Sequence, residues 1–393
     1  MAKPLRDVRI LELATVLAAP LTSTLLAEYG AEVVKVEQPG TGDPVRGYAP
    51  YSGEESLHWR VTGRNKKSVT LDLHEPEARE IALALAGRSD VVVTNFRPGT
   101  LRAWGLDYPQ LSEIKPDLIM YHLTGFGRTG PYADRPGFAR IAEALSGLAS
   151  LTGYPDRPPV FAGYPIADGI AGVYGAFAVM LALRHRDATG EGQLVDLALY
   201  EPLLRMMEDL VVGFATTGRM KERSGTAQPN ICPNNVFPTL DGEYLILPAS
   251  TEQMWQRLVK LLDLAEFRGW DSNQQRLDHR EEIEQGIARY TSRYPLVDLL
   301  ERFDDAGIAC GRFYSAADIV ADPHVRERGN LMEIWDEGLQ RQLTVQAPIP
   351  HFSSLTAEVT PAPGLGQHTD EVLCRDLGLD PALVHDYRQR GIV

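Results

Sequence analysis

Short runs of β-branched and other apolar residues alternate with helical segments through the first half of the chain, and this alternation constrains its fold more than any other feature. Such runs occupy residues 8–13, 31–37, 67–73, 90–96 and 117–123, with helical periodicity at 21–29 and 75–88. The alternation is typical of βαβ units and predicts an α/β protein with an open, mostly parallel sheet. Ligands of such sheets bind at the carboxyl ends of the strands, so the predicted site lies in the loops that open at Ala14, Gln38, Asn95 and Gly125.

One carboxylate, Asp168, stands at the start of a long apolar helical run. Gly172 and Gly175 leave part of the helix surface without side chains, which predicts that another element packs tightly against it. Two interpretations of Asp168 stay open. It is either an ordinary N-cap in the positive end of the helix dipole, or a nucleophile that Pro165 and Gly169 hold in a turn facing a cleft.

The pattern of the sequence changes after a further strand-like run at 193–200. A hairpin turning at 241–242 is followed by helical periodicity at 251–265, 280–290 and 295–306. The predicted division is a large domain at 1–200, a linker at 201–224, a smaller α+β domain at 225–321, and a connector with a C-terminal segment at 322–393.

The composition argues against several classes of function. With 393 residues and 44% hydrophobic residues, the chain is long enough for two domains. A formal net charge of -14 disfavours binding to nucleic acid or to an anionic membrane surface. The three cysteines lie far apart without metal-ligand spacing, so neither disulfides nor a metal site is expected. Without an apolar leader or a run of eighteen apolar residues, the predicted location is the cytoplasm.

The segment 125–130 matches the glycine pattern G-x-G-x-x-G directly after a predicted strand. A dinucleotide fingerprint requires a helix next, whereas Pro131 and Pro136 block its immediate formation here. A nicotinamide-dependent oxidoreductase is therefore disfavoured.

Two other segments are candidate sites for an anionic ligand. Arg64, Lys66 and Lys67 concentrate positive charge just before a strand, either as a solvated strand entrance or as a landing site for phosphates. The segment 94–99 places an amide, a ring and an arginine at the end of another strand, where they are suited to clamp an adenine and its phosphates.

Taken together, the motifs resemble those of the class III coenzyme A-transferases, the family of formyl-CoA and carnitine-CoA transferases. The resemblance rests on GAEVVKVEQPGTGDPVR, RNKKS, NFRPG, GFGRTGPY, RPGF, Asp168 followed by glycine, TGEGQ and LGQHTDEVL, which span nearly the whole chain. It implies a Rossmann-like large domain completed by the C-terminal segment, a small domain between these parts, and an interlocked homodimer. The α-methylacyl-CoA racemases share this superfamily.

The resemblance also implies the site. Coenzyme A takes part as a substrate rather than as a permanently bound cofactor, and Asp168 is acylated, first as a mixed anhydride and then as an aspartyl-CoA thioester. N–H groups at the helix mouth and in the 16–18 loop are candidate oxyanion donors. The candidate coenzyme A contacts are Val16, Leu17, Ala18, Gln38, Leu71, His74, Asn95, Phe96 and Arg97, together with the basic cluster Arg64, Lys66 and Lys67.

Departures from the family pattern bear on the substrate. Leu17 and Ala139 stand where formyl-CoA transferase has a glutamine and a tyrosine, which favours a larger acyl group. Arg46 and Arg140 are candidate partners for a second carboxylate, so a small dicarboxylic or branched acid is expected. Phe138 stands where the racemases have a histidine that moves a proton, which disfavours racemisation. A non-catalytic CoA-binding protein is the remaining alternative.

Overall fold

The computed structural model describes residues 3–264 and 267–393, which form two compact units. The larger unit contains the chain up to Leu148 together with Phe161–Gly213 and His324–Val393, and the smaller contains Ala149–Val160 and Phe214–Pro323. The predicted start of the large domain at residue 1 and the predicted helix end at residue 265 lie outside the described residues.

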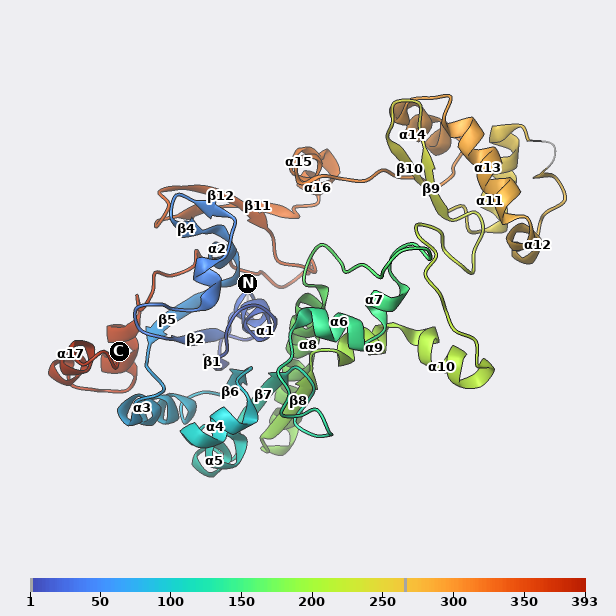
Figure 1. Ribbon diagram of the computed structural model, residues 1–393. Helices are drawn as coiled ribbons and strands as arrows, with labels where there is room; N and C mark the ends of the chain where they lie inside the picture. Colours follow the sequence, from blue (N-terminus) through green and yellow to red (C-terminus); the bar gives the residue numbers. More distant parts are fainter. Residues whose placement is uncertain (1–2, 265–266) are drawn as a thin grey trace. The chain divides into compact units, whose positions relative to one another are not determined.

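A six-stranded sheet lies at the centre of the larger unit (Figure 1). Its strands are β1 (Arg9–Leu13), β2 (Glu32–Glu37), β5 (Lys66–Thr70), β6 (Val91–Thr94), β7 (Ile119–Thr124) and β8 (Gln193–Ala198). They are arranged in the order β5-β2-β1-β6-β7-β8, and every neighbouring pair is parallel. The predicted α/β class is confirmed. The strand order reverses between β1 and β6, which is where open sheets of this type bind ligands.

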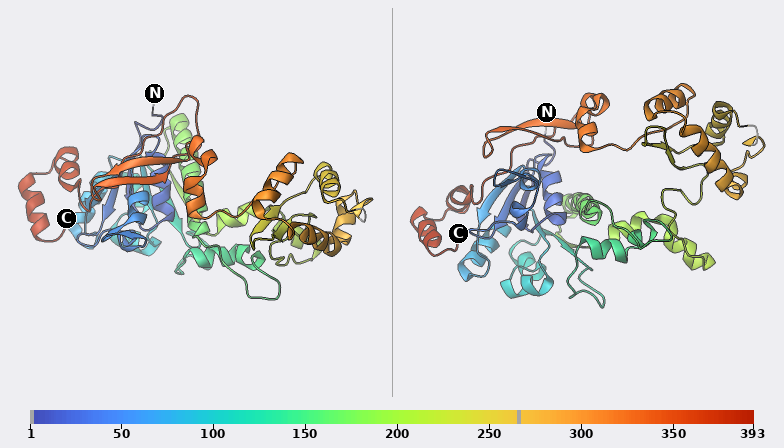
Figure 2. Two further views of the ribbon diagram at one scale, coloured as in Figure 1. Left: turned by 90° about the horizontal axis from the view of Figure 1, so that it is seen from above. Right: turned by 45° about the horizontal axis from the view of Figure 1, so that its top comes forward.

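Helices cover both faces of the sheet because neighbouring residues of a strand point to opposite sides (Figures 1 and 2). On one face, Leu11 and Val34 pack with α3 (Pro76–Ala86), α4 (Pro98–Trp104), α5 (Tyr108–Ile114) and α17 (Pro381–Gln389). On the other face, Ile10 and Val33 pack with α1 (Ala18–Ala27), α6 (Ala139–Leu145), α8 (Ile166–Thr189) and α9 (Glu201–Met206). Burial on both faces explains why the strands are continuous apolar runs in the sequence.

Helix α8 packs closely against α1 because its glycines leave no room for side chains. A Cβ built on Gly172 would lie 2.8 Å from Leu21 Cβ, and one built on Gly175 would lie 2.2 Å from Thr22 Oγ1. The predicted tight packing is confirmed. By length and composition α8 is the one helix among the described residues that meets the requirements of a membrane span, and one of its faces packs closely against α1.

The C-terminal segment completes the larger unit beside β5. His368 N–H donates to Ser68 O at 2.9 Å, and Asp72 N–H donates to Ile392 O at 2.8 Å. An antiparallel pair, β11 (Leu331–Asp336) and β12 (Arg341–Gln346), precedes a π-helical segment at Glu371–Asp376.

The remaining short elements are a 3-10 helix at Pro44–Gly47, β3 (Tyr51–Ser52), β4 (Glu55–Ser56), α2 (Leu57–Thr62), α7 (Leu148–Leu151), α10 (Glu208–Thr217), α15 (Ala316–Ala321) and α16 (Pro323–Glu327).

The smaller unit contains the predicted hairpin, formed by β9 (Asn235–Pro238) and β10 (Tyr244–Leu247). Its core is covered by α11 (Glu252–Leu262), α12 (Asn273–Asp278), α13 (Arg280–Thr291) and α14 (Leu296–Asp305). Residues 149–160 join this unit although the sequence-based division assigned them to the large domain. The reason is local bonding, because Gly225 N–H donates to Gly153 O and Arg223 donates to the carbonyls of Ser150, Tyr154 and Arg157.

Candidate active site

A cavity of about 310 Å³ opens at the carboxyl ends of β1, β6, β7 and β8, beside the point where the strand order reverses. Residues 15–18 and 123–125 line it, together with Asn95, Arg97, Pro98, Asp168 and Leu199. The loops predicted to open at Ala14, Asn95 and Gly125 therefore meet at one site. In the described part of the chain, no group of three or more His, Cys, Asp or Glu residues is arranged to hold a metal ion.

Asp168 lies in the first turn of α8, three residues after the N-cap, Pro165. The helix has no side-chain cap, so the interpretation of Asp168 as an N-cap is wrong. Among the described residues, no hydrogen bond or ion pair engages the Asp168 carboxylate. This carboxylate is therefore not committed to holding the fold.

The surroundings of Asp168 disfavour its charge. Burial, reinforced by the negative charge of Glu143, raises the pKa of Asp168 from an ordinary 3.8 to about 6. Glu143 is 1% exposed on α6; its Oε2 accepts from Ala162 N–H at 3.4 Å, and its Oε1 has no hydrogen-bond partner in the described structure. Asp168 remains mostly ionised at neutral pH, and its carboxylate is more basic than one in water.

This environment predicts the pH dependence of a reaction that uses Asp168 as a nucleophile. We expect kcat/KM to fall on the acid side with an apparent pKa of about 6, because only the ionised carboxylate attacks. Glu143→Gln removes the neighbouring negative charge and should move this limb to lower pH. The exposed Glu113→Gln on α5 serves as the control and should leave the limb in place. A pH profile whose limb is unmoved by Glu143→Gln would contradict this account.

The β1–α1 loop presents N–H groups to the cavity. Val16 N–H is already committed, since it donates to the Asp43 carboxylate at 3.1 Å. Leu17 and Ala18, at the uncapped start of α1, have N–H groups with no acceptor in the described structure. The candidate donors of the 16–18 loop are thus narrowed to Leu17 and Ala18, next to the positive end of the α1 dipole.

A second cavity of about 300 Å³ shares Thr15 with the first. Trp104 lies on its wall with edge-on ring contacts to Phe96 and His74, at centroid distances of 5.1 and 5.6 Å. Four predicted coenzyme A contacts line this cavity, namely Gln38, Leu71, His74 and Phe96. Five others, Val16, Leu17, Ala18, Asn95 and Arg97, line the first. The structure thus brings these predicted residues together in two adjoining cavities.

The basic cluster Arg64, Lys66 and Lys67 lies outside both cavities, so its predicted role as a phosphate site is corrected here. Arg64 is paired with Glu28, Lys66 Nζ lies 2.8 Å from Glu12 Oε2, and Lys67 lies between two glutamates. Arg64 and Lys66 are 7% and 5% exposed, so they do not form a solvated strand entrance either. None of the three lines either cavity. Their charges neutralise carboxylates of the fold and are not presented to a phosphate.

The predicted acyl-selecting arginines are also not where the prediction required them. Arg46 binds Glu37 through two contacts of 2.7 and 2.8 Å, and its guanidinium lies 3.7 Å from the Trp59 ring centroid. It is therefore already engaged and does not line the cavity of Asp168. Arg140 donates to Ala162 O at 3.2 Å and likewise lies outside the lining. The predicted neighbours Phe138 and Ala139 do line it.

Sequence reasoning missed several residues of the site. Arg135 lines the cavity with its guanidinium 3.9 Å from the Tyr132 ring centroid, and no carboxylate among the described residues pairs with it. Its position in the RPGF motif was the available signal. Trp104 and Glu143 had no such signal, because an isolated tryptophan or glutamate in a helix is most often structural.

Comparison with a solved structure defines the class of protein. A CAIB/BAIF family protein from Brucella suis has the same fold, with a TM-score of 0.84 and 32% sequence identity over 97% of this chain and 100% of that chain. The sequence profile of CoA-transferase family III matches residues 5–369. The chain therefore belongs to CoA-transferase family III and is a CoA-transferase, which confirms the resemblance.

Two relatives come from Chloroflexus aurantiacus. The succinyl-CoA–D-citramalate CoA-transferase is 40% identical over 96% of this chain and 95% of its own length. The beta subunit of the succinyl-CoA–L-malate CoA-transferase is 38% identical over 99% of this chain and 98% of its own length.

Proposed function

We propose that this enzyme moves coenzyme A between two small dicarboxylic acids, with Asp168 as the covalent acceptor of the acyl group. The observation that carries the proposal is an unengaged, largely buried carboxylate beside free helix N–H groups at the strand-order reversal. The names of the two Chloroflexus relatives support the substrate class, because each names succinyl-CoA with a dicarboxylic acid.

The proposed reaction consists of four acyl exchanges without net proton transfer. Asp168 attacks the thioester carbonyl of the donor, the C–S bond breaks, and a mixed anhydride and a coenzyme A thiolate form. The thiolate attacks the Asp168 carbonyl carbon and releases the donor acid as its carboxylate. The acceptor carboxylate then attacks the resulting aspartyl thioester and again forms an anhydride and a thiolate. Attack of this thiolate on the acceptor acyl carbon gives the new thioester and restores Asp168.

Each exchange passes through an oxyanion, and the start of α1 is suited to bind it. The free N–H groups of Leu17 and Ala18 are the proposed donors, each contributing about 3 kcal/mol by analogy with other oxyanion holes. A nucleophile that is already ionised at neutral pH requires no partner base, which agrees with a cavity lining in which the described residues include no histidine or lysine. Racemisation would require a proton-transferring group on each side of the substrate, so this lining favours transfer.

Coenzyme A is proposed to span the two adjoining cavities. The slot lined by Phe96, Trp104 and His74 matches the flat, largely apolar adenine, and the thioester then reaches Asp168 past Thr15. Arg97, at the rim of the first cavity and without an ion-pair partner in the described structure, is the proposed phosphate contact. Retention of coenzyme A through the reaction makes its later attacks effectively intramolecular.

Arg135 is the proposed partner of the second carboxylate of the substrate, in place of Arg46. We expect Arg135→Gln to lower kcat/KM for succinyl-CoA by about 100-fold and to leave butyryl-CoA, which lacks the second carboxylate, little changed. Arg140→Gln, outside the lining, is the matched control. Equal use of the two donors by the wild type would contradict the dicarboxylate assignment.

The function itself is tested by supplying succinyl-CoA with a panel of free acids and identifying new thioesters by mass spectrometry. The expected result is a new dicarboxylic acyl-CoA with release of succinate. Failure of the wild type to form any new thioester from the panel would overturn the proposal.

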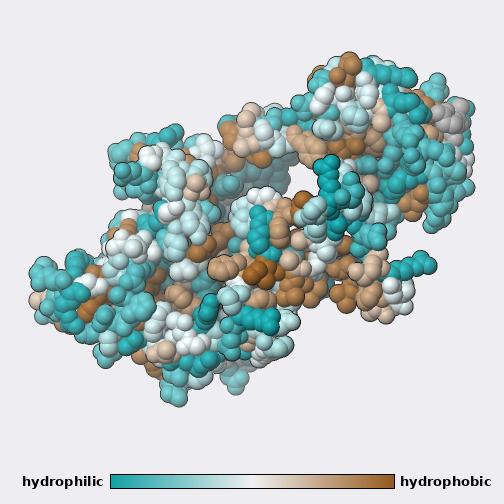
Figure 3. Space-filling view, in the orientation of Figure 1, coloured by the Kyte–Doolittle hydropathy of each residue, from teal (hydrophilic) through white to brown (hydrophobic). Residues whose placement is uncertain are grey.

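We also propose that the enzyme acts in the cytoplasm as a homodimer. Support comes from an apolar face of α8 that is exposed in the single chain, with Val173, Phe177 and Leu181 each more than half exposed. Figure 3 shows further apolar surface at α10, where Val211 and Val212 are exposed. Light scattering that gives the mass of one chain, 43.4 kDa, at micromolar concentration would contradict the dimer.

A further inference from the structure

The backbone of the β1–α1 loop is strained at the wall of the active-site cavity. Four non-glycine residues of the described chain have positive φ, and Val16, at +69°, is the β-branched one among them. This region is sterically unfavourable for a β-branched side chain, so the surrounding structure must hold Val16 there. The next two residues are Leu17 and Ala18, whose free N–H groups open the helix.

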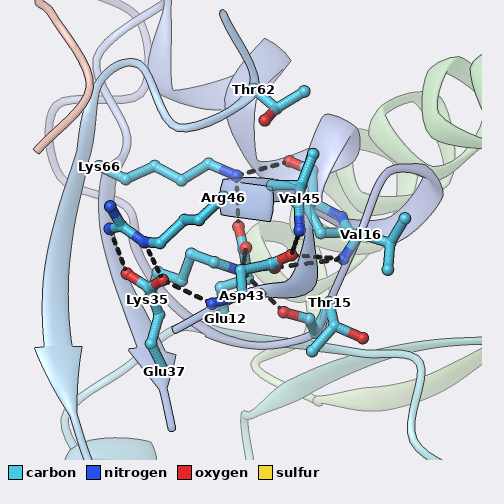
Figure 4. Close-up of polar contacts among 12 residues, drawn as sticks. Glu12, Thr15, Val16, Lys35, Glu37, Asp43, Val45, Arg46, Thr62 and Lys66 are labelled. Atoms are coloured by element: carbon cyan, nitrogen blue, oxygen red, sulfur yellow. Dashed lines mark hydrogen bonds and ion pairs between the residues drawn. The ribbon is translucent and has the colours of Figure 1, made fainter. Parts of the chain in front are cut away.

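Two buried charges hold this loop (Figure 4). Asp43 is 2% exposed, and its Oδ1 and Oδ2 accept from Val16 N–H at 3.1 and 3.2 Å. Lys35 Nζ lies 2.7 Å from Asp43 Oδ2 and donates to Ala14 O at 2.8 Å. Asp43 therefore binds the backbone after Thr15, at Val16 N–H, and Lys35 binds it before Thr15, at Ala14 O.

The same charge network continues to the first turn of α1. Glu12 Oε1 accepts from Lys35 at 2.8 Å, and Glu12 Oε2 lies 2.8 Å from Lys66 Nζ, which donates to Pro20 O at 2.9 Å. Backbone groups of Ala14, Val16 and Pro20 are thus tied to buried charges that balance one another. An ordinary packing role would not require charged contacts to three backbone groups of one short segment.

We propose that Asp43, backed by Lys35, is a positioning residue that holds Val16 at positive φ and thereby aims the Leu17 and Ala18 N–H groups at the reacting carbonyl. This inference rests on the proposed function, since it assigns these N–H groups to the oxyanion. Without Asp43, Val16 relaxes toward negative φ and turns the loop away from the acyl group. Misplacement of this kind lowers the rate of the chemical step more than substrate affinity.

The test measures how far kcat falls in Asp43→Ala and how much of that loss a second substitution, Val16→Gly, recovers. Asp43→Ala is expected to lower kcat about 100-fold and to raise KM for acyl-CoA by much less, although Asp43 also lines the second cavity. Val16→Gly in the same chain should recover about tenfold of that loss, because glycine adopts positive φ without steric cost. Val16→Gly alone is measured as the reference for the double variant and should lower kcat less than Asp43→Ala does, since Asp43 still binds its N–H. If Asp43→Ala does not fold, Asp43→Asn with and without Val16→Gly is measured, with a smaller loss and the same recovery expected.

A matched control separates positioning from stability. Asp107→Asn removes the charge of another buried carboxylate, paired with Arg128, whose pKa is lowered by that pairing and which does not contact the loop, and it should lower Tm without lowering kcat. Unchanged kcat in the Asp43 variants, or a loss that Val16→Gly does not relieve, overturns the inference. Hydrogen exchange of the 14–18 segment, faster in Asp43→Ala, reports the loop independently of turnover. Failure of the wild type to transfer coenzyme A would instead overturn the proposed function.

Discussion

Asp168→Ala is expected to lower kcat for CoA transfer by about 10⁴-fold or more, the largest effect of any single substitution in this chain. The reason is chemical, because neither anhydride nor thioester can form without this carboxylate. Asp168→Asn should show a comparable loss although it keeps the shape of the side chain. Steady-state transfer from succinyl-CoA, read by mass spectrometry, measures both.

The same substitutions should leave the fold intact. The Asp168 carboxylate has no hydrogen-bond partner in the described structure, and burial raises its pKa, so its charge costs stability at neutral pH. We therefore expect Tm to be unchanged or slightly raised and coenzyme A affinity by calorimetry to be preserved. Wild-type turnover in Asp168→Ala would exclude a covalent role, and an unfolded variant would show that the carboxylate is structural.

Glu12→Gln is expected to destabilise the larger unit by about 3–5 kcal/mol, the largest effect on stability. Glu12 is fully buried between Lys35 and Lys66, each with a 2.8 Å contact. Loss of its charge leaves Lys35 with Asp43 as its ion-pair partner and leaves Lys66 without one in the described structure, while the nearby Glu37 is paired with Arg46. Thermal unfolding should show a Tm lower by about 10 °C.

The effect should depend on pH with a defined sign. Burial alone would raise the pKa of Glu12, but Lys35 and Lys66 lower it overall. A carboxylate whose pKa is lowered by folding stabilises above its unfolded value, and this stabilisation is lost as pH falls through the folded pKa. The difference between wild type and Glu12→Gln should therefore shrink in acid. Glu113→Gln, exposed on α5, is the control, and equal Tm values for the two variants would show that the buried pairs contribute little.

The central sheet was predictable from the sequence because strands buried on both faces must be apolar along their whole length. The runs at 31–37 and 90–96 became β2 and β6 within a few residues of the predicted ends. Parallel strands bring their carboxyl ends to one edge, so the strand pattern alone predicts that the loops around residues 14 and 95 meet at one site.

The roles of the charged residues were not predictable in the same way. Lys66 looks like part of a ligand-binding cluster in the sequence, whereas its carboxylate partner Glu12 comes from another strand far back in the chain. Arg46 similarly forms an ion pair with Glu37. The sequence shows which residues are charged but not how far apart those residues lie in the fold. It also gives no sign that Val16, rather than a glycine, has positive φ, because the acceptor of its N–H, Asp43, lies 27 residues away in the chain.

The covalent role of Asp168 is tested most directly by peptide mass spectrometry of the enzyme mixed with succinyl-CoA and quenched with hydroxylamine, which traps acyl-aspartyl species as a hydroxamate. The account predicts that the peptide containing Asp168 carries the modification in wild type and that the corresponding peptide of Asp168→Asn does not. Transfer that proceeds without modification of this peptide, or with the modification at another residue, would contradict it.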